Sequence, residues 1–176
     1  MIESIFREPA LIGYLVKSLR EKFPNKRVGK TIIQKMVYLL VRLGVMDFGY
    51  SMYHYGPYSS GVSGELNFAE NNDIVEMEWV EDAGYFITPG DGLERFEYLV
   101  TEDEKRQIDN TVKKYGKFNA GELSLIATAL YLRDNFGVSD ERLTEVVHDV
   151  KEQYPVSYIR KILEQGEIID QIQIPF

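Results

Sequence analysis

The fold is decided by the stretch from residue 30 to residue 59, which reads KTIIQKMVYLLVRLGVMDFGYSMYHYGPYS. Its first part, from residue 30 to about residue 43, predicts a helix whose apolar positions cover more than one face. A helix that is apolar around much of its circumference belongs in the middle of a core. Gly44 follows as the expected C-terminal cap, because glycine adopts the left-handed conformation at little cost.

The aromatic half of this stretch, residues 48–55, predicts a short strand or extended segment, which we expect Gly56 and Pro57 to break. A weaker helix is predicted over residues 59–70. Its buried stripe would consist of Val62, Leu66 and Ala69, which recur at helical spacing.

Upstream of this stretch, the sequence predicts a first helix that begins near Pro9, since proline is favoured at the first helical position. Apolar residues at i, i+4 spacing, from Leu11 to Phe23, give this helix a buried face, and Pro24 ends it. Downstream, residues 75–88 predict a β-hairpin in which Val75, Met77 and Trp79 alternate with glutamates. The alternation predicts that Trp79 is substantially buried.

The order of helix, helix, strand-like segment, helix and hairpin is that of a winged helix-turn-helix. From Thr101 onward the signals are helical, with a capping-box pattern at Thr101 and an Asx cap at Asn119. The third of four expected helices begins near Ser139 and turns residues up to Val150 inward, and Pro155 opens the last. The predicted fold class is therefore α+β and mostly α: a winged helix-turn-helix-like half with a β-hairpin wing (residues 1–100), followed by a four-helix half (residues 101–176) that packs on it as one compact unit.

Composition narrows the functional classes. The chain has no cysteine, and His54 and His148 lie far apart in sequence, so we expect no metal site and no cofactor. The N-terminus lacks the continuous apolar core of a signal peptide, and the longest apolar stretch, residues 32–45, is too short to span a bilayer. We therefore expect a cytoplasmic protein without membrane contact.

Charge is distributed unevenly along the chain. The net charge is −8 overall, but residues 1–50 carry +5 whereas residues 51–100 carry −9. Such asymmetry predicts a positive and a negative end, unless folding places the two side by side. It also allows association, in which a basic segment meets an acidic surface of a partner or of a second copy; neutralisation within one molecule is the alternative.

Two motifs carry a resemblance to a known family. The segment KTIIQKMVYLL, beginning at Lys30, is followed by FGY at residues 48–50 and by YHYGPYS at residues 53–59. Together they resemble the Panacea antitoxin superfamily and, more closely, its uncharacterised YwgA-type relatives, which pair an "LQK-hydrophobic-YLL" helix with a "YGPYS" turn. The resemblance extends weakly to residues 114–123. Ile33 stands where the relatives often have leucine, and residues 76–100 are unusually acidic.

The resemblance implies a winged-helix-related fold without an assigned reaction. In the antitoxin members this fold recognises and neutralises diverse partner toxins. The expected ligand is therefore a protein partner, such as a toxin. The chain is expected not to be an enzyme.

The tyrosine-rich segment is the main candidate site. In the structural interpretation Gly56 supplies backbone freedom, Pro57 fixes φ and Ser59 or Ser60 caps the next helix. In the functional interpretation the segment docks a partner, since tyrosine is enriched at interface hot spots. The two interpretations are compatible. The predicted partner-binding residues are Tyr53, Tyr55, Gly56, Pro57, Tyr58 and Ser59.

Lys35 and His54 are the two residues of this region that could carry chemistry. A lysine on an apolar helix is usually an edge residue whose amine reaches solvent, and this is the expectation for Lys35. A buried functional lysine is the alternative, which requires a partner in a pocket. No nucleophile or carboxylate lies at a recognisable spacing from His54, so no catalytic residue is predicted.

DNA binding by a winged-helix transcriptional regulator is the rival function. The helix predicted at residues 59–70 would enter the major groove, yet it contains no lysine or arginine and does contain Glu65 and Glu70. Phosphate contacts dominate nucleic-acid affinity, so an acidic helix and wing disfavour this function. A basic segment could still contact a nucleic-acid backbone or an acidic partner through Lys22, Lys26, Arg27 and Lys30.

Overall fold

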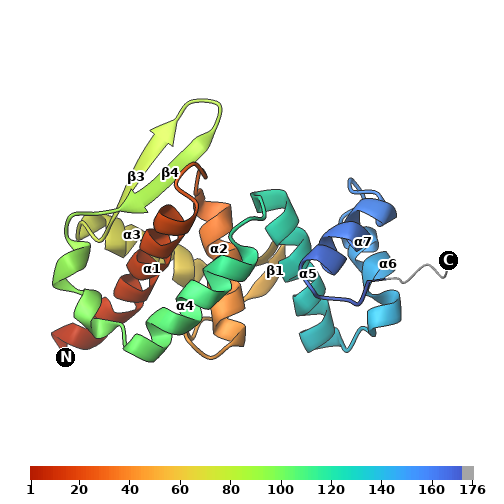
Figure 1. The fold of residues 1–176 in the computed structure, drawn as a ribbon, viewed down its shortest axis with the longest axis horizontal. Coiled ribbons are helices and arrows are strands. Elements are labelled where there is room, and N and C mark those ends of the chain that lie inside the picture. Colours follow the sequence, from red (N-terminus) through yellow and green to blue (C-terminus); the bar gives the residue numbers. More distant parts are fainter. Residues whose placement is uncertain (172–176) are drawn as a thin grey trace.

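The computed structural model describes residues 1–171 and has a mostly helical α+β fold (Figure 1). This confirms the predicted fold class at the level of helices and hairpins. Within the described residues the helices are α1 (Ile2–Lys22), α2 (Lys30–Arg42), α3 (Ser60–Asn71), α4 (Glu102–Tyr115), α5 (Ala120–Phe136), α6 (Asp140–Val150) and α7 (Val156–Gln165). Two short 3-10 turns, η1 (Leu93–Arg95) and η2 (Glu97–Leu99), connect the second hairpin to α4.

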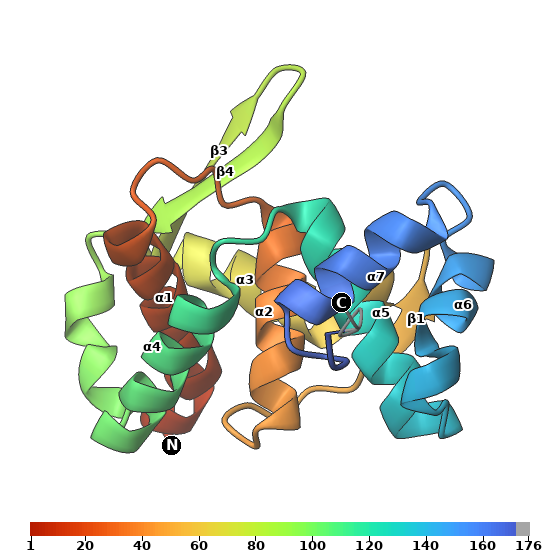
Figure 2. The ribbon, with the colours of Figure 1, turned by 45° about the vertical axis from the view of Figure 1, so that its right-hand side comes forward.

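The core is built around α2 and α5. Every residue from Ile32 to Leu40 in α2 and from Leu123 to Leu130 in α5 is buried, so neither helix has a solvent face along these stretches. The two helices pack against each other, with α1 and α4 on one side and α6 and α7 on the other (Figure 2). The predicted central position of α2 is therefore confirmed.

Helix α1 begins seven residues before the predicted start. Pro9 lies inside the helix, where its missing N–H leaves the carbonyl group of Ile5 without an intrahelical donor. Ile5 is exposed, so water can satisfy that carbonyl, while Pro9 itself is buried among the residues that face the core. Burial of the apolar face thus outweighs the local preference of proline for the first turn.

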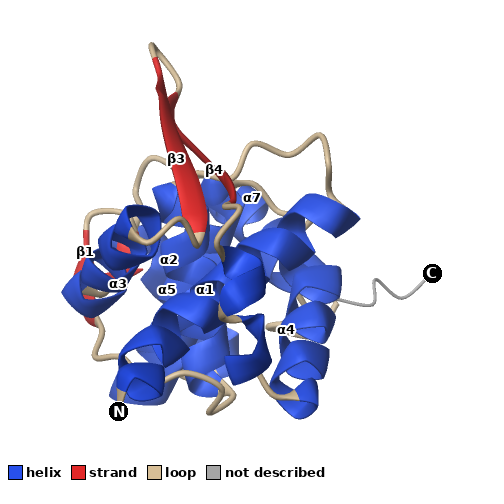
Figure 3. Ribbon diagram, turned by 90° about the vertical axis from the view of Figure 1, so that its left-hand side faces the viewer, coloured by secondary structure: helices blue, strands red, loops and turns tan. Residues whose placement is uncertain are grey.

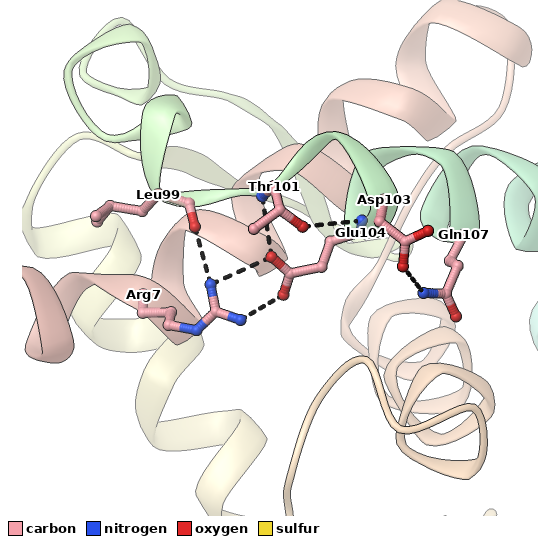
Figure 4. A network of polar contacts seen from close by, with 6 residues as sticks. All are labelled: Arg7, Leu99, Thr101, Asp103, Glu104 and Gln107. Carbon is pink, nitrogen blue, oxygen red and sulfur yellow. Dashed lines mark hydrogen bonds and ion pairs between the residues drawn. The ribbon is translucent and has the colours of Figure 1, made fainter.

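A polar network joins the start of α1 to the start of α4 (Figure 4). The guanidinium group of Arg7 forms two hydrogen bonds with the carboxylate of Glu104 and donates a third to the carbonyl oxygen of Leu99, at 2.9 Å. Glu104 also completes the predicted capping box with Thr101. The Arg7 guanidinium and the Thr101 donors hold the pKa of Glu104 below its usual value, against the opposing effect of burial. A bidentate, capped ion pair of this kind fixes α4 against α1.

The chain contains two antiparallel hairpins. Strands β1 (Ser51–Tyr53) and β2 (Gly56–Tyr58) pair with Ser51 opposite Tyr58 and Tyr53 opposite Gly56. The prediction that Gly56 and Pro57 break the strand is therefore wrong, because the turn lies at residues 54–55 and Gly56 opens the returning strand with φ of +97°. Ser59 then caps α3, as predicted, by accepting a hydrogen bond from the Val62 backbone.

The second hairpin, β3 (Val75–Val80) and β4 (Gly84–Pro89), has the predicted position but not the predicted burial. It projects beyond the helices (Figure 3), so only its base reaches the core. Val75 and Ile87 are almost fully buried, whereas the side chain of Trp79 is 63% exposed. The prediction of a buried Trp79 is wrong: alternation identifies one face of a hairpin but not how far the core extends along it.

The remaining C-terminal helices follow the expected order. Asn119 forms a capping box with Glu122 at the start of α5, Ser139 precedes α6, and Pro155 precedes α7. Leu143 and Val147 of α6 are buried as expected, but Val150 is 48% exposed at the last position of that helix, so its inward prediction is wrong. Val150 is the last residue of α6 and lies on its solvent side, whereas Val147 in the same turn is buried.

Candidate functional site

The candidate site is a cavity of about 430 Å³ between the first turns of α2 and the β1–β2 hairpin. It is lined by four residues of α2 and five of the hairpin: Lys30, Thr31, Gln34, Lys35, Tyr53, His54, Tyr55, Gly56 and Tyr58. Its size lies within the range of about 300 to 1,000 Å³ that is typical of small-ligand and side-chain pockets.

Gln34 fixes the hairpin to α2 through the backbone of Ser59. Its side-chain amide donates to the Ser59 carbonyl oxygen at 2.8 Å and accepts from the Ser59 N–H at 3.0 Å. The carbonyl of Gln34 itself accepts a hydrogen bond from the Tyr50 hydroxyl at 3.0 Å. These groups are buried or half-buried, so each bond is protected from competition by water.

Lys35 makes the second connection between α2 and the hairpin. Its ammonium group donates to the carbonyl oxygen of Pro57 at 2.8 Å, and the residue is only 2% exposed. The expectation that this lysine reaches solvent is therefore wrong. Because α2 is enclosed on every side along this stretch, the helix has no solvent-facing edge to which the Lys35 side chain could extend. Lys35 instead fits the alternative, a buried lysine that lines a pocket.

Lys151 holds the turn of the same hairpin from the opposite half of the chain. It follows the last residue of α6 and donates from its ammonium group to the carbonyl oxygen of His54 at 2.8 Å. Lys151 is 3% exposed. Nothing in the sequence around residue 151 indicates this contact, which joins residues 97 positions apart.

Burial and mutual repulsion act on these two amines. Burial, with a smaller contribution from the charge of Lys151, lowers the pKa of Lys35 to about 8. Burial also lowers the pKa of Lys151. Neither amine forms an ion pair with a carboxylate in the part of the chain that the structure describes. Buried charges in proteins are normally paired, so this arrangement is unusual.

The predicted docking residues divide into two groups. Tyr53 and Tyr55 are 59% and 72% exposed, and the ring of Tyr58 lies 5.1 Å from that of Tyr53. Tyr58 is half-buried, whereas Gly56, Pro57 and Ser59 are buried. The three buried residues therefore shape the hairpin, and the tyrosines form its accessible surface.

Gly56 sits where the hairpin approaches α5 most closely. A Cβ atom at this position would lie 2.8 Å from the Thr128 hydroxyl oxygen and 3.3 Å from the Ser124 carbonyl oxygen. The Thr128 hydroxyl is fully buried and has no hydrogen-bond partner within residues 1–171. Together with a φ of +97°, this close approach explains why the turn carries glycine.

Three residues of the basic segment, Lys26, Arg27 and Lys30, line a second groove of about 520 Å³ beside the β3–β4 hairpin. Lys22 forms an ion pair with Asp109, and Lys26 donates to the carbonyl oxygen of Phe118. Lys30 lies over the ring of Tyr85, 4.0 Å from its centroid, and Arg27 is exposed. Three of the four predicted basic contacts are thus occupied within the protein, by groups other than the acidic residues of the hairpin.

Other features give no additional site. No group of three or more histidine, aspartate or glutamate residues within residues 1–171 is placed to hold a metal ion. None of the helices described is long and apolar enough to cross a membrane. No protein-family model matches the chain, and no curated protein is significantly similar to it. The resemblance to the Panacea superfamily therefore stays a prediction.

Proposed function

We propose that this chain is a non-enzymatic protein-interaction module that binds a partner protein through the β1–β2 hairpin and the cavity beside it. The main observation in support of this proposal is that Tyr53 and Tyr55 are exposed on a hairpin whose backbone is fixed by buried side chains. An exposed aromatic side chain on a fixed backbone binds with little loss of conformational entropy. Tyrosine in such a position is typical of interface hot spots.

The antitoxin-like part of the proposal is supported by sequence resemblance. The "QK" and "YGPYS" motifs that carry it meet in space, since Gln34 and Lys35 bind the backbone at Ser59 and Pro57. We further infer that α1, α2, α3 and the β3–β4 hairpin form a winged-helix-like unit, because they follow one another in the order expected for that fold. The partner in this interpretation is a toxin.

Site-specific photo-cross-linking tests the proposed surface. Tyr55 is replaced by p-benzoylphenylalanine in the native cell, and Tyr98, which is 67% exposed in η2, is replaced in the same way as the control. We expect one defined protein to be cross-linked from position 55 and not from position 98. A pattern that is the same from both positions would contradict the proposal.

The antitoxin-like role has a separate test. The product of the neighbouring, co-directional gene is expressed with and without this protein, and growth is measured. We expect the wild type to relieve growth arrest and the Tyr55→Ala variant to fail. A neighbouring product without toxicity, or rescue that Tyr55→Ala leaves intact, would contradict an antitoxin role that acts through this hairpin.

Nucleic-acid binding ranks second, on the observation that exposed Arg27 and Trp79 border the same groove. Against it, α3 carries no basic side chain, and Lys22, Lys26 and Lys30 are occupied within the protein. We expect no micromolar retention of random duplex DNA at about 50 mM salt, where phosphate binding is strong. Tight binding that weakens steeply with salt and in the Arg27→Ala variant would reverse the ranking.

A further inference from the structure

The ammonium group of Lys35 has unused hydrogen-bonding capacity in the cavity that it lines. A lysine ammonium carries three donors, and Lys35 uses one of them, on the Pro57 carbonyl oxygen. The other cation among the cavity residues, Lys30, lies over the Tyr85 ring in the neighbouring groove. The Gln34 amide is bound to Ser59 in both directions. Lys35 is therefore the buried cation of this cavity, and two of its three donors are available to a ligand.

The surroundings of Lys35 leave its charge uncompensated. After burial, the charge of Lys151, which has the same sign, lowers the pKa of Lys35 further. No carboxylate lies within ion-pair distance of either amine in residues 1–171, although the whole chain carries 28 acidic residues. A buried charge without a partner costs free energy, and a bound anion would remove that cost.

We infer that this cavity binds the carboxylate of an aspartate or glutamate side chain of the partner protein, with an adjacent apolar side chain packed against the tyrosine rings. The inference rests on the proposed function, which says that a partner binds here, and adds the chemistry that the partner presents. The carboxylate would accept from Lys35 at the base of the cavity, while the rings of Tyr53 and Tyr58, whose centroids are 5.1 Å apart, offer apolar surface above it.

Charge and geometry favour a carboxylate over a phosphate. One carboxylate neutralises the buried ammonium group of Lys35, whereas a phosphate brings more negative charge and more acceptor oxygens. Phosphate recognition in proteins usually uses arginine forks or several backbone N–H groups, and no arginine lines this cavity. A singly charged carboxylate next to an apolar side chain therefore matches the charge and the lining of this cavity better than a phosphate does.

The test uses a small carboxylate probe and its uncharged amide analogue. 3-Phenylpropionate is titrated into the ¹⁵N-labelled full-length protein, and 3-phenylpropanamide and phenyl phosphate are titrated in parallel. We expect saturable shifts of the backbone amide signals of residues 53–56 and 58 with the carboxylate, and an affinity at least about 10-fold weaker for the amide and for the phosphate. Equal affinity of carboxylate and amide would overturn the inference, and tighter binding of the phosphate would assign the cavity to phosphate instead.

Three variants separate charge from structure. Lys35→Gln removes the charge but keeps a donor for Pro57, Lys35→Met removes both, and Lys113→Met removes an exposed lysine of α4 as the control. We expect the two Lys35 variants to lose carboxylate binding, with the Gln variant folded as judged by its amide spectrum, and the control to bind as the wild type does. Carboxylate binding retained by Lys35→Gln would overturn the inference.

The inference and the proposed function can fail separately. If the partner cross-linked from position 55 binds Lys35→Gln as tightly as wild type but loses affinity for Tyr55→Ala, the carboxylate inference is wrong and the proposed function stands. If the probe binds as expected but position 55 cross-links no defined protein, the proposed function is wrong and the anion site belongs to a free carboxylate.

Discussion

The ammonium group of Lys35 lies 2.8 Å from the carbonyl oxygen of Pro57, so a side chain buried in the central helix determines where the strand β2 runs. This contact positions the half-buried Tyr58 and, through the register of the hairpin, the exposed Tyr53. The same lysine that shapes the hairpin also lines the cavity beside it. Its charge state therefore influences both the stability of the fold and the binding of an anion.

The stability of the wild type should increase with pH above about 8 relative to the Lys35→Met variant. The pKa of Lys35 is lowered in the folded state to about 8, whereas the unfolded value is near 10.5. Below pH 8 both states are protonated and the cost of the buried charge is constant. Between pH 8 and 10.5 the unfolded state binds more protons, so the free energy of unfolding increases with pH, by at most about 1.4 kcal/mol per pH unit.

Urea unfolding of wild type and Lys35→Met from pH 7 to 10 measures this difference, and the subtraction removes titrations that the two proteins share. The charged or titratable groups around Lys35 are Lys30, Lys151, His54 and the cavity tyrosines, which both proteins contain. A difference that is independent of pH would show that Lys35 is not buried as a charge.

Glu8→Gln should stabilise the protein above pH 6 and not below pH 4.5. Burial is the main cause that raises the pKa of Glu8 to about 6, and one of its carboxylate oxygens has no hydrogen-bond partner within the described residues. A raised folded-state pKa means that the contribution of Glu8 to stability is fully present below pH 4.5 and is lost as pH rises through 6. We expect a gain of about 1 kcal/mol at pH 8 by urea unfolding. An equal effect of the substitution at pH 4 and pH 8 would contradict the assignment.

Gly56→Ala should destabilise the fold by about 2 kcal/mol or more. The new Cβ would meet the Thr128 hydroxyl and the Ser124 carbonyl, and alanine at a φ of +97° is strained. Gly49→Ala is the matched control, since a Cβ there has no neighbour within 4 Å and its φ is not positive. Thermal unfolding of both variants checks this, and equal melting temperatures would contradict the close approach of the hairpin to α5.

Trp79→Ala should change the free energy of unfolding by less than about 1 kcal/mol, because the side chain is 63% exposed. Ile87→Ala on the paired strand is the control: Ile87 is 2% exposed, and its truncation should cost about 2 to 5 kcal/mol. Native tryptophan emission should be red-shifted and readily quenched by acrylamide. Blue-shifted, protected emission would mean that the hairpin folds back onto the molecule.

The sequence predicts local features of this fold better than distant ones. The end of α2, the caps at Ser59, Thr101 and Asn119, and the position of the β3–β4 hairpin follow from propensities and capping chemistry within a few residues. The start of α1 does not, since its first two turns depend on the packing of Phe6 against Phe68 and Phe96 and on the Arg7–Glu104 pair, all distant in sequence. The exposure of Trp79 depends on how far a hairpin extends beyond the core, which alternation does not encode.

The candidate site was only partly predictable for a similar reason. The tyrosine-rich hairpin stands out in the sequence. A charged lysine within an otherwise apolar helix stands out as well, and this mismatch is the signal by which the sequence marks Lys35. The sequence alone favours an edge residue, which is the common case, because one helix considered alone always has an outer side. Lys151 has no local signal, since its contact with His54 exists only after the two halves of the chain have packed.

The most direct test of the central claim is the dissociation constant of the cross-linked partner, measured by calorimetry for wild type, Tyr55→Ala and Tyr98→Ala. Both tyrosines are highly exposed, so neither truncation should alter the fold, and the two variants differ only in where the ring is lost. We expect Tyr55→Ala to weaken binding at least about 10-fold, as a hot-spot truncation that costs about 1.4 kcal/mol or more does, and Tyr98→Ala to bind as the wild type does. Equal affinity of wild type and Tyr55→Ala would contradict the claim that the β1–β2 hairpin is the binding surface.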